Sequence, residues 1–242
     1  MEKSPNYLYR YIPNLITILA LFCGLTSIKF SINGEWKVAV YLIVFASFLD
    51  FFDGWIARKL KGDSNFGAEL DSLSDVIAFG VAPSFLIYFW SLTELGSFGW
   101  SITLFFVACS SLRLARFTAD IYLTSKPIDP SIYFTGVPSP AAAGLSLLPL
   151  FLFFEFNFSI LQNAYINSVN LALIGFLMVS KIPTVSLKSI NFSKKFGTWI
   201  LLMTVVICIG IISNLWITLS IVTFLYLVSI IYTIFINLFS QR

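Results

Sequence analysis

The sequence is divided into about eight apolar stretches, each long enough to cross a membrane as a helix. A bilayer core of about 30 Å takes roughly 20 helical residues. Of the 242 residues, 58% are hydrophobic and 11% are charged, whereas a water-soluble domain carries about 25% charged residues. We therefore expect an all-α fold, a polytopic membrane helical bundle whose spans are Ile12–Ile32, Glu35–Lys59, Gly67–Thr93, Ser97–Leu123, Val137–Phe156, Leu161–Ser180, Phe196–Ile212 and Asn214–Phe239.

The Lys and Arg residues fall mainly on one side of an arrangement with about eight spans. Of the 15 Lys and Arg residues, Lys29 and Lys37 lie on the side opposite the two chain ends, and the others lie on the same side as the ends. Because the cytoplasmic loops of membrane proteins are enriched in Lys and Arg, we expect both termini to be cytoplasmic.

The cytoplasmic end of the second expected span has an acidic face whose other residues are small. On a helix, Asp50 and Asp53 fall within one arc of about 100°. The same arc holds Gly54 and Ala57, and Arg58 lies at its edge. The small residues leave room for a large group against the backbone, and a guanidinium fork binds phosphate oxygens. This face therefore predicts a phosphate-binding surface.

The start of the third expected span repeats a single spacing. Gly67, Asp71 and Asp75 are four residues apart, so a helix stacks them along one stripe, one turn apart. Asp50 and Asp53 lie at a similar shallow depth in the span before. The sequence therefore predicts that four carboxylates converge near the cytoplasmic side of the membrane.

These acids, and the absence of His, indicate which ion such a site binds. Four carboxylates cannot all stay ionised in a small space unless a cation neutralises them. The chain has no His, and its three Cys lie inside apolar runs, at Cys23, Cys109 and Cys208. Carboxylate oxygens alone suit Mg²⁺ or Mn²⁺ rather than Zn²⁺. We therefore predict a metal-and-phosphate site, in preference to a solvated acidic turn between two helices, with any proton transfer made by a carboxylate.

The residues from Asp50 to Asp75 follow the pattern D-x2-D-G-x2-A-R-x8-G-x3-D-x3-D. This pattern resembles the signature of the CDP-alcohol phosphotransferase family, and every fixed position matches. The resemblance implies two divalent ions, Mg²⁺ or Mn²⁺, with the ligands Asp50, Asp53, Asp71 and Asp75. It also implies a nucleotide held against Gly54, Ala57, Arg58 and Gly67.

Further stretches resemble the phosphatidylserine synthase branch of this family. They are Ile12–Gly24, Ala78–Tyr88, Leu112–Thr118, Phe134–Gly144 and Leu177–Lys188. The branch usually has Asn where this chain has Thr118. The resemblance implies a catalytic domain at residues 1–188, followed by a C-terminal pair of membrane helices at residues 189–242.

The resemblance to this branch implies transfer of the phosphatidyl group from CDP-diacylglycerol to L-serine, which gives phosphatidylserine and CMP. Asp75 is the expected general base for the serine hydroxyl. Arg113 and Arg116 are expected on the acceptor side, because an arginine fork can hold the serine carboxylate; the alternative is that they reach for the headgroup region at a helix end. Asn14 and Thr17 are candidate nucleotide ligands or helix caps.

The expected setting is the cytoplasmic membrane of a bacterium or an archaeon, with the active site facing the cytosol. Membrane lipid is an expected partner, nucleic acid is not, and a homodimer is left open. Ser139 either faces the site or caps the fifth span.

Two other functions remain to be tested. The acceptor can be glycerol 3-phosphate, inositol phosphate or choline, since a phosphorylated acceptor would also bind arginine. Alternatively, the protein is a cation transporter whose acids bind the transported ion. A transporter of this kind is expected to have internal repeats and a site near the membrane midplane. The sequence shows no repeat, and Gly54, Ala57 and Arg58 would have no role in such a site.

Overall fold

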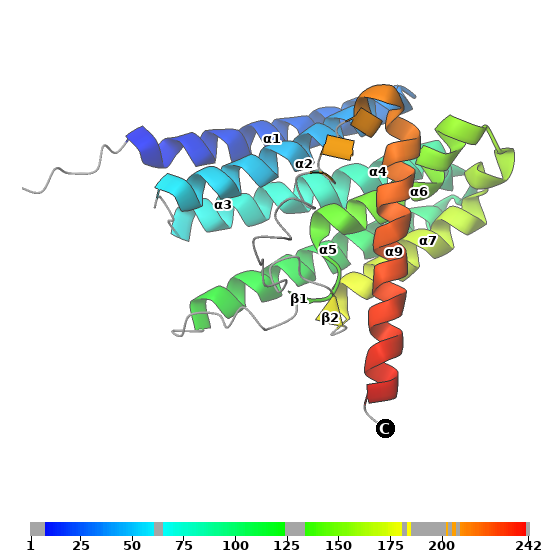
Figure 1. Ribbon diagram of the computed structural model, residues 1–242. Coiled ribbons are helices and arrows are strands. Elements are labelled where there is room, and N and C mark those ends of the chain that lie inside the picture. The colour runs from blue at the N-terminus through cyan, green and yellow to red at the C-terminus, as the bar shows by residue number, and fades with distance from the viewer. Residues whose placement is uncertain are drawn as a thin grey trace, which may run out of the picture.

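The structure is a computed structural model of the chain, and it describes residues 8–60, 65–123, 134–180, 183–184, 202, 205–206 and 209–240. Helices dominate the fold (Figure 1). They are α1 (Leu8–Ile32), α2 (Trp36–Leu60), α3 (Asn65–Asp75), the π-helix η1 (Val76–Val81), α4 (Ala82–Trp90), the 3-10 turn η2 (Leu92–Leu95), α5 (Ser97–Leu123), α6 (Ser139–Phe156), the 3-10 turn η3 (Ser159–Gln162), α7 (Ala164–Val179) and α9 (Leu215–Ser240). β1 (Phe134–Thr135) and β2 (Pro183–Thr184) form one short antiparallel pair. The expected all-α fold is confirmed.

Within the described ranges, six helices are long and apolar enough to cross a membrane. They cover Tyr11–Ile32, Trp36–Lys59, Asn65–Trp90, Ser97–Ala119, Ser139–Phe156 and Leu215–Phe235. The polytopic membrane bundle is therefore confirmed. The expected span Phe196–Ile212 lies largely outside the described residues. The count of about eight spans and the cytoplasmic position of both termini stay predictions.

The expected span Leu161–Ser180 is present as a shorter helix, α7, of 16 residues. The Oδ1 atom of Asn163 accepts hydrogen bonds from the backbone N–H groups of Tyr165 and Ile166. Asn163 therefore caps the start of α7, and the residues before it form the turn η3. The predicted start was too early because a polar cap interrupts the apolar run.

The third expected span changes helix type directly after Asp75. Residues Val76–Val81 form the π-helix η1, and the Ala82 N–H donates to the Ile77 carbonyl. Pro83 follows, and proline has no amide hydrogen for the ordinary helical bond. Single π-turns inside helices are often found at functional sites. Here the π-helix separates the acidic helix α3 from the buried helix α4.

Helix α1 packs against α2, α3 and η1, and the first three helices lie side by side in Figure 1. The backbones come close at Gly24, where an added Cβ would lie 2.8 Å from the Cα of Ala78. Only a glycine permits backbones to come this near. The contact holds the first half of α1 beside the acidic ends of α2 and α3.

The apolar core lies among α4, α5, α6 and α7. Leu86, Phe106, Leu150 and Leu171, one from each of these helices, are fully buried in it.

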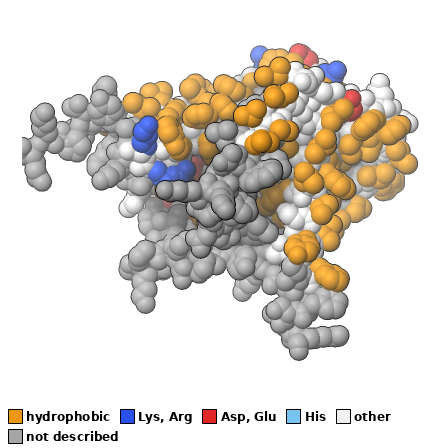
Figure 2. Space-filling model, viewed as in Figure 1, with side chains coloured by type: hydrophobic (Ala, Val, Ile, Leu, Met, Phe, Trp, Pro, Cys, Tyr) orange, Lys and Arg blue, Asp and Glu red, His pale blue; other side chains and the backbone are white. Residues whose placement is uncertain are grey.

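Hydrophobic side chains cover much of the described surface in Figure 2, and charged side chains lie in small groups near the ends of the helices. Helix α9 runs across the other helices in Figure 1 and packs against α6. The acids of α2 and α3 are not among the residues of this apolar core.

Candidate metal and phosphate site

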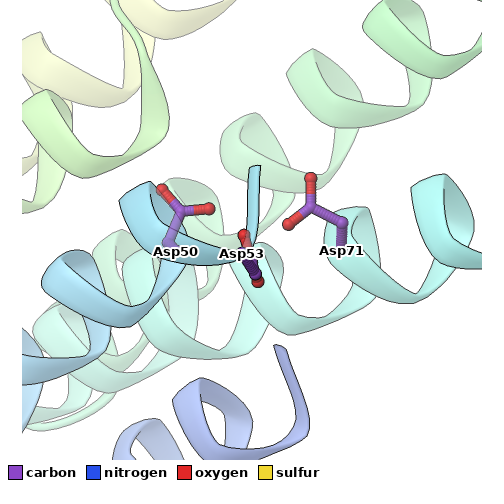
Figure 3. A group of neighbouring side chains, drawn as sticks. All are labelled: Asp50, Asp53 and Asp71. Carbon is purple, nitrogen blue, oxygen red and sulfur yellow. The ribbon is translucent and has the colours of Figure 1, made fainter. Parts of the chain in front are cut away.

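Three of the predicted carboxylates meet between α2 and α3 (Figure 3). Asp50, Asp53 and Asp71 each place one carboxylate oxygen within 4.8 Å of the other two. Asp53 is buried, and Asp50 and Asp71 are half-buried. A separation of three residues puts Asp50 and Asp53 on one face of α2, and α3 presents Asp71 to that face. The predicted convergence is therefore present for these three acids.

Asp75 is the fourth predicted acid and lies at the end of α3, one helical turn beyond Asp71. Its carboxyl group comes within hydrogen-bonding reach of that of Asp50. Two carboxylates at this distance repel each other unless a proton or a cation lies between them. Asp75 thus adjoins the group of three through Asp50.

The chemistry of these side chains fits a hard divalent cation. The group of three offers carboxylate oxygens, and among the described residues no Cys side chain joins it. Mg²⁺ and Mn²⁺ prefer such oxygen ligands, and separations of 4.8 Å or less let one ion neutralise several carboxylates. The cluster can therefore hold a metal ion, while the kind and the number of ions stay predictions.

Thr17 of α1 joins the two acidic helices. Its hydroxyl donates to Oδ2 of Asp53 at 2.6 Å, and its carbonyl accepts a hydrogen bond from the Ser74 hydroxyl of α3 at 3.1 Å. Thr17 is itself buried. The sequence suggested a nucleotide ligand or a helix cap at this position, whereas the structure shows a buried hydroxyl that orients a carboxylate of the cluster.

The four predicted nucleotide-binding residues lie on the two helices that carry the cluster, α2 and α3. A Cβ added at Gly54 would meet no atom within 4 Å, so space is free beside this turn of α2. Ala57 and Gly67 are half-buried, and the Arg58 side chain is exposed at the end of α2. The room that the small residues predicted is present at Gly54, and nucleotide binding by all four stays a prediction.

Arg113 of α5 binds α6 and interacts with Asp75 of α3. Its Nη1 donates to the Ser139 hydroxyl at 2.7 Å, so Ser139 faces the site instead of capping α6. Asp75 and Arg113 attract each other electrostatically. The Nε atom of Arg113 is buried and has no hydrogen-bond partner among the described residues. Arg113 therefore places a positive charge beside Asp75 at the edge of the carboxylate cluster. Its Nε–H group is left as a donor without a partner among the described residues.

Arg116 and Thr118 of α5 make different contacts from those expected of an acceptor site. The Nη2 atom of Arg116 donates to the Val179 carbonyl at the end of α7, at 2.8 Å. The hydroxyls of Thr118 and Ser72 lie 3.1 Å apart and link α5 to α3. The two arginines thus donate to different partners, Ser139 and the Val179 carbonyl, and binding of an acceptor by either one stays a prediction.

Sequence reasoning gave no role to Ser74 or Ser72, which connect α3 to α1 and α5. Each is a small polar residue beside an acid in the chain, and such residues are common in any membrane helix that packs tightly. Their partners lie 57 and 46 residues away. No local spacing in the sequence could have identified these contacts.

Comparison with known proteins identifies the family. The model of the CDP-alcohol phosphatidyltransferase family matches residues 10–179. A protein of Helicobacter pylori named CDP-diacylglycerol–serine O-phosphatidyltransferase is 36% identical over 202 residues, which cover 84% of this chain and 82% of that protein. Proteins of the same name from Bacillus subtilis and Methanocaldococcus jannaschii are each 38% identical, over 71% of this chain and over 88% and 72% of their own lengths. The chain belongs to the CDP-alcohol phosphatidyltransferase family.

Proposed function

We propose that the protein transfers the phosphatidyl group of CDP-diacylglycerol to L-serine, giving phosphatidylserine and CMP. The observation that carries the proposal is the cluster of Asp50, Asp53 and Asp71. Next to it, Asp75 and Arg113 form a pair of opposite charges. The relatives named above supply the substrate class. A cation transporter would leave Arg113 and the free space at Gly54 without a role.

Asp50, Asp53, Asp71 and Asp75 would hold the divalent metal. When bound, Mg²⁺ or Mn²⁺ would neutralise the pyrophosphate oxygens of the nucleotide lipid. The small residues Gly54, Ala57 and Gly67 would admit the cytidine nucleotide, and Arg58 would bind its phosphates through its fork of donors. The chain itself therefore supplies positioning and charge, which are the main requirements of phosphoryl transfer.

Asp75 is the proposed general base. The serine hydroxyl oxygen would form a new bond to the lipid-linked phosphorus, the bond from that phosphorus to the CMP oxygen would break, and the hydroxyl proton would pass to the Asp75 carboxylate. Arg113 adjoins Asp75 and would receive the serine carboxylate, with Arg116 as the weaker candidate. This arrangement would place the hydroxyl of the acceptor next to the base.

The catalytic domain is proposed to span residues 1–188, which the family match at residues 10–179 supports. Residues 189–242 would add a C-terminal pair of membrane helices. The distribution of Lys and Arg supports a site that faces the cytosol from the cytoplasmic membrane. The serine and the released CMP are water-soluble and would enter and leave on that side.

The test is CMP release by purified protein that is given CDP-diacylglycerol with Mg²⁺ or Mn²⁺. L-serine, glycerol 3-phosphate, inositol phosphate and choline are supplied in turn. Release with serine alone is the expected result. Release with another acceptor would overturn the choice of serine and keep the phosphotransferase chemistry, and no release with any acceptor would favour a transporter.

The same assay tests the role of Asp75. Asp75→Asn keeps the size of the side chain and removes the base, so turnover should fall by about 10²-fold or more while metal-dependent binding of CDP-diacylglycerol survives. Glu69→Gln is the matched control, because Glu69 is an exposed acid on the same helix. Normal turnover in Asp75→Asn would remove Asp75 as the base.

A further inference from the structure

The C-terminal end of α7 receives hydrogen bonds from two other parts of the chain. A helix leaves its last four carbonyl groups without partners of its own. The Val179 carbonyl accepts a hydrogen bond from Nη2 of Arg116 on α5, at 2.8 Å. The Leu177 carbonyl accepts one from the backbone N–H of Val137, at 3.4 Å. The end of α7 therefore joins α5 to the segment that precedes α6.

The segment before α6 lies close against the same helix end at Gly136. This residue has a φ of 85°, a left-handed conformation that glycine adopts without strain. A Cβ added at Gly136 would collide with the carbonyl oxygen of Met178. Directly before it, β1 pairs with β2, which follows α7 in the chain. The backbone of residues 134–137 is therefore docked on the end of α7 and on the strand after it.

The docked segment leads directly to Ser139, the first residue of α6. The Ser139 hydroxyl accepts a hydrogen bond from Nη1 of Arg113 on α5, at 2.7 Å. Pro138 and Pro140 flank Ser139, and a proline ring fixes its backbone φ, so a displacement at Val137 is passed on to Ser139. Helix α5 therefore contacts the start of α6 directly through Arg113 and is connected to it a second time through the end of α7.

Arg116 makes this second connection. A guanidinium inside an apolar bundle requires oxygen atoms around it, and the C-terminal end of a helix carries partial negative charge. The end of α7 offers Arg116 both. We propose that Arg116 is a positioning residue of the acceptor site: by binding the end of α7, it holds the segment that places Ser139 against Arg113. This inference rests on the proposed function, since it assigns the acceptor's anionic group to Arg113 and leaves Arg116 without direct contact with the acceptor.

Two substitutions of Arg116 separate positioning from direct binding of the acceptor. Arg116→Gln removes a hydrogen bond from a charged group, so the KM for serine should rise about tenfold, while the KM for CDP-diacylglycerol stays as in the unmodified protein. Arg116→Lys keeps one cationic donor for the Val179 carbonyl and should recover most of the loss, whereas Lys cannot replace an arginine fork on a carboxylate. An unchanged serine KM in Arg116→Gln, an equal rise in both KM values, or no recovery in Arg116→Lys would overturn the proposal.

A double substitution tests whether Arg116 acts through Ser139. Ser139→Ala removes the oxygen that receives Arg113, so its serine KM should rise. Adding Arg116→Gln should raise the KM no further, because both changes disturb one arrangement, and effects that multiply would overturn the proposal. If the protein uses another acceptor, the same comparison is made with that acceptor, and the proposed choice of serine fails while the inference on Arg116 stands.

Ser111→Ala is the matched control for these measurements. Ser111 also lies on α5, and its hydroxyl donates to the Val107 carbonyl of its own helix at 2.9 Å. The variant therefore loses a hydrogen bond on α5 and leaves the end of α7 untouched, so both KM values should stay as in the unmodified protein. A serine KM that rises as much in Ser111→Ala as in Arg116→Gln would overturn the proposal.

Amide hydrogen exchange provides a readout that needs no activity. Pro138 and Pro140 have no amide hydrogen, so a peptide covering residues 134–141 reports few amides, among them the Val137 N–H that donates to α7. Deuterium uptake by this peptide should be faster in Arg116→Gln than in the unmodified protein, because local opening exposes these amides. Unchanged uptake would overturn the inference, even in a protein that releases no CMP.

Discussion

The Thr17 hydroxyl lies 2.6 Å from Oδ2 of Asp53, inside the bundle and away from water. A carboxylate that binds a metal keeps its orientation through such hydrogen bonds from neighbouring groups, and their loss typically weakens metal binding by about 10- to 100-fold. The same hydrogen bond also gives the buried Asp53 carboxylate a donor. A buried carboxylate without such a partner would cost free energy. Thr17 therefore serves both the stability of α1 and the geometry of the cluster.

Thr17→Val keeps the shape of the side chain and removes the hydroxyl. The Mn²⁺ concentration needed for half-maximal CMP release should rise by about tenfold or more, and the free energy of unfolding should fall by about 1–3 kcal/mol. Thr26→Val is the matched control, because Thr26 also lies on α1 but is only half-buried and donates to the Phe22 carbonyl of its own helix. Equal metal dependence in both variants would contradict the role of Thr17.

At the scale of the helices, the π-helix η1 is held between two neighbours. On one side, Gly24 of α1 approaches the backbone of Ala78. On the other, a Cβ added at Gly80 would lie 2.7 Å from Oγ and 2.9 Å from Cβ of Ser110 on α5. Because η1 begins directly after Asp75, these two contacts fix where α3 ends and where its acids point.

Gly80→Ala should force η1 away from α5. Inserting a methyl group into a packed contact costs about 1–3 kcal/mol, so the melting temperature and the rate of CMP release should both fall. Adding Ser110→Gly removes both of the atoms that the new Cβ would meet, and the double variant should recover most of the loss. A double variant that is less stable than Gly80→Ala would show that this contact does not control the position of η1.

The acidic faces of α2 and α3 could be predicted because helical periodicity turns a spacing in the sequence into a position in space. The hydrogen bond from Thr17 to Asp53 could not, since the two residues are 36 positions apart and meet through the packing of α1 at Gly24. Gly80 and Pro83 are residues that can bend a helix, but no local rule distinguishes a kink from a π-helix. Packing between helices, which single-sequence patterns do not encode, accounts for these differences.

For the whole molecule, the distribution of charge predicts which side of the membrane each end of the bundle faces. In a variant whose three native cysteines are replaced by alanine, Lys59→Cys and Glu94→Cys place single thiols at exposed positions. A membrane-impermeant maleimide added to intact cells should label Glu94→Cys and should label Lys59→Cys only after the membranes are opened. The reverse pattern would place the carboxylate cluster on the outer side.

The cluster carboxylates come from α2 and α3, whereas Arg113 and Ser139 come from α5 and α6. Under the proposed mechanism, the groups that break the pyrophosphate and the groups that choose the alcohol therefore sit on different helices. Substitutions on α5 or α6 can then change the acceptor without disturbing the bond-breaking machinery. An engineer who wants a new phospholipid headgroup would leave α2 and α3 untouched and vary α5 and α6.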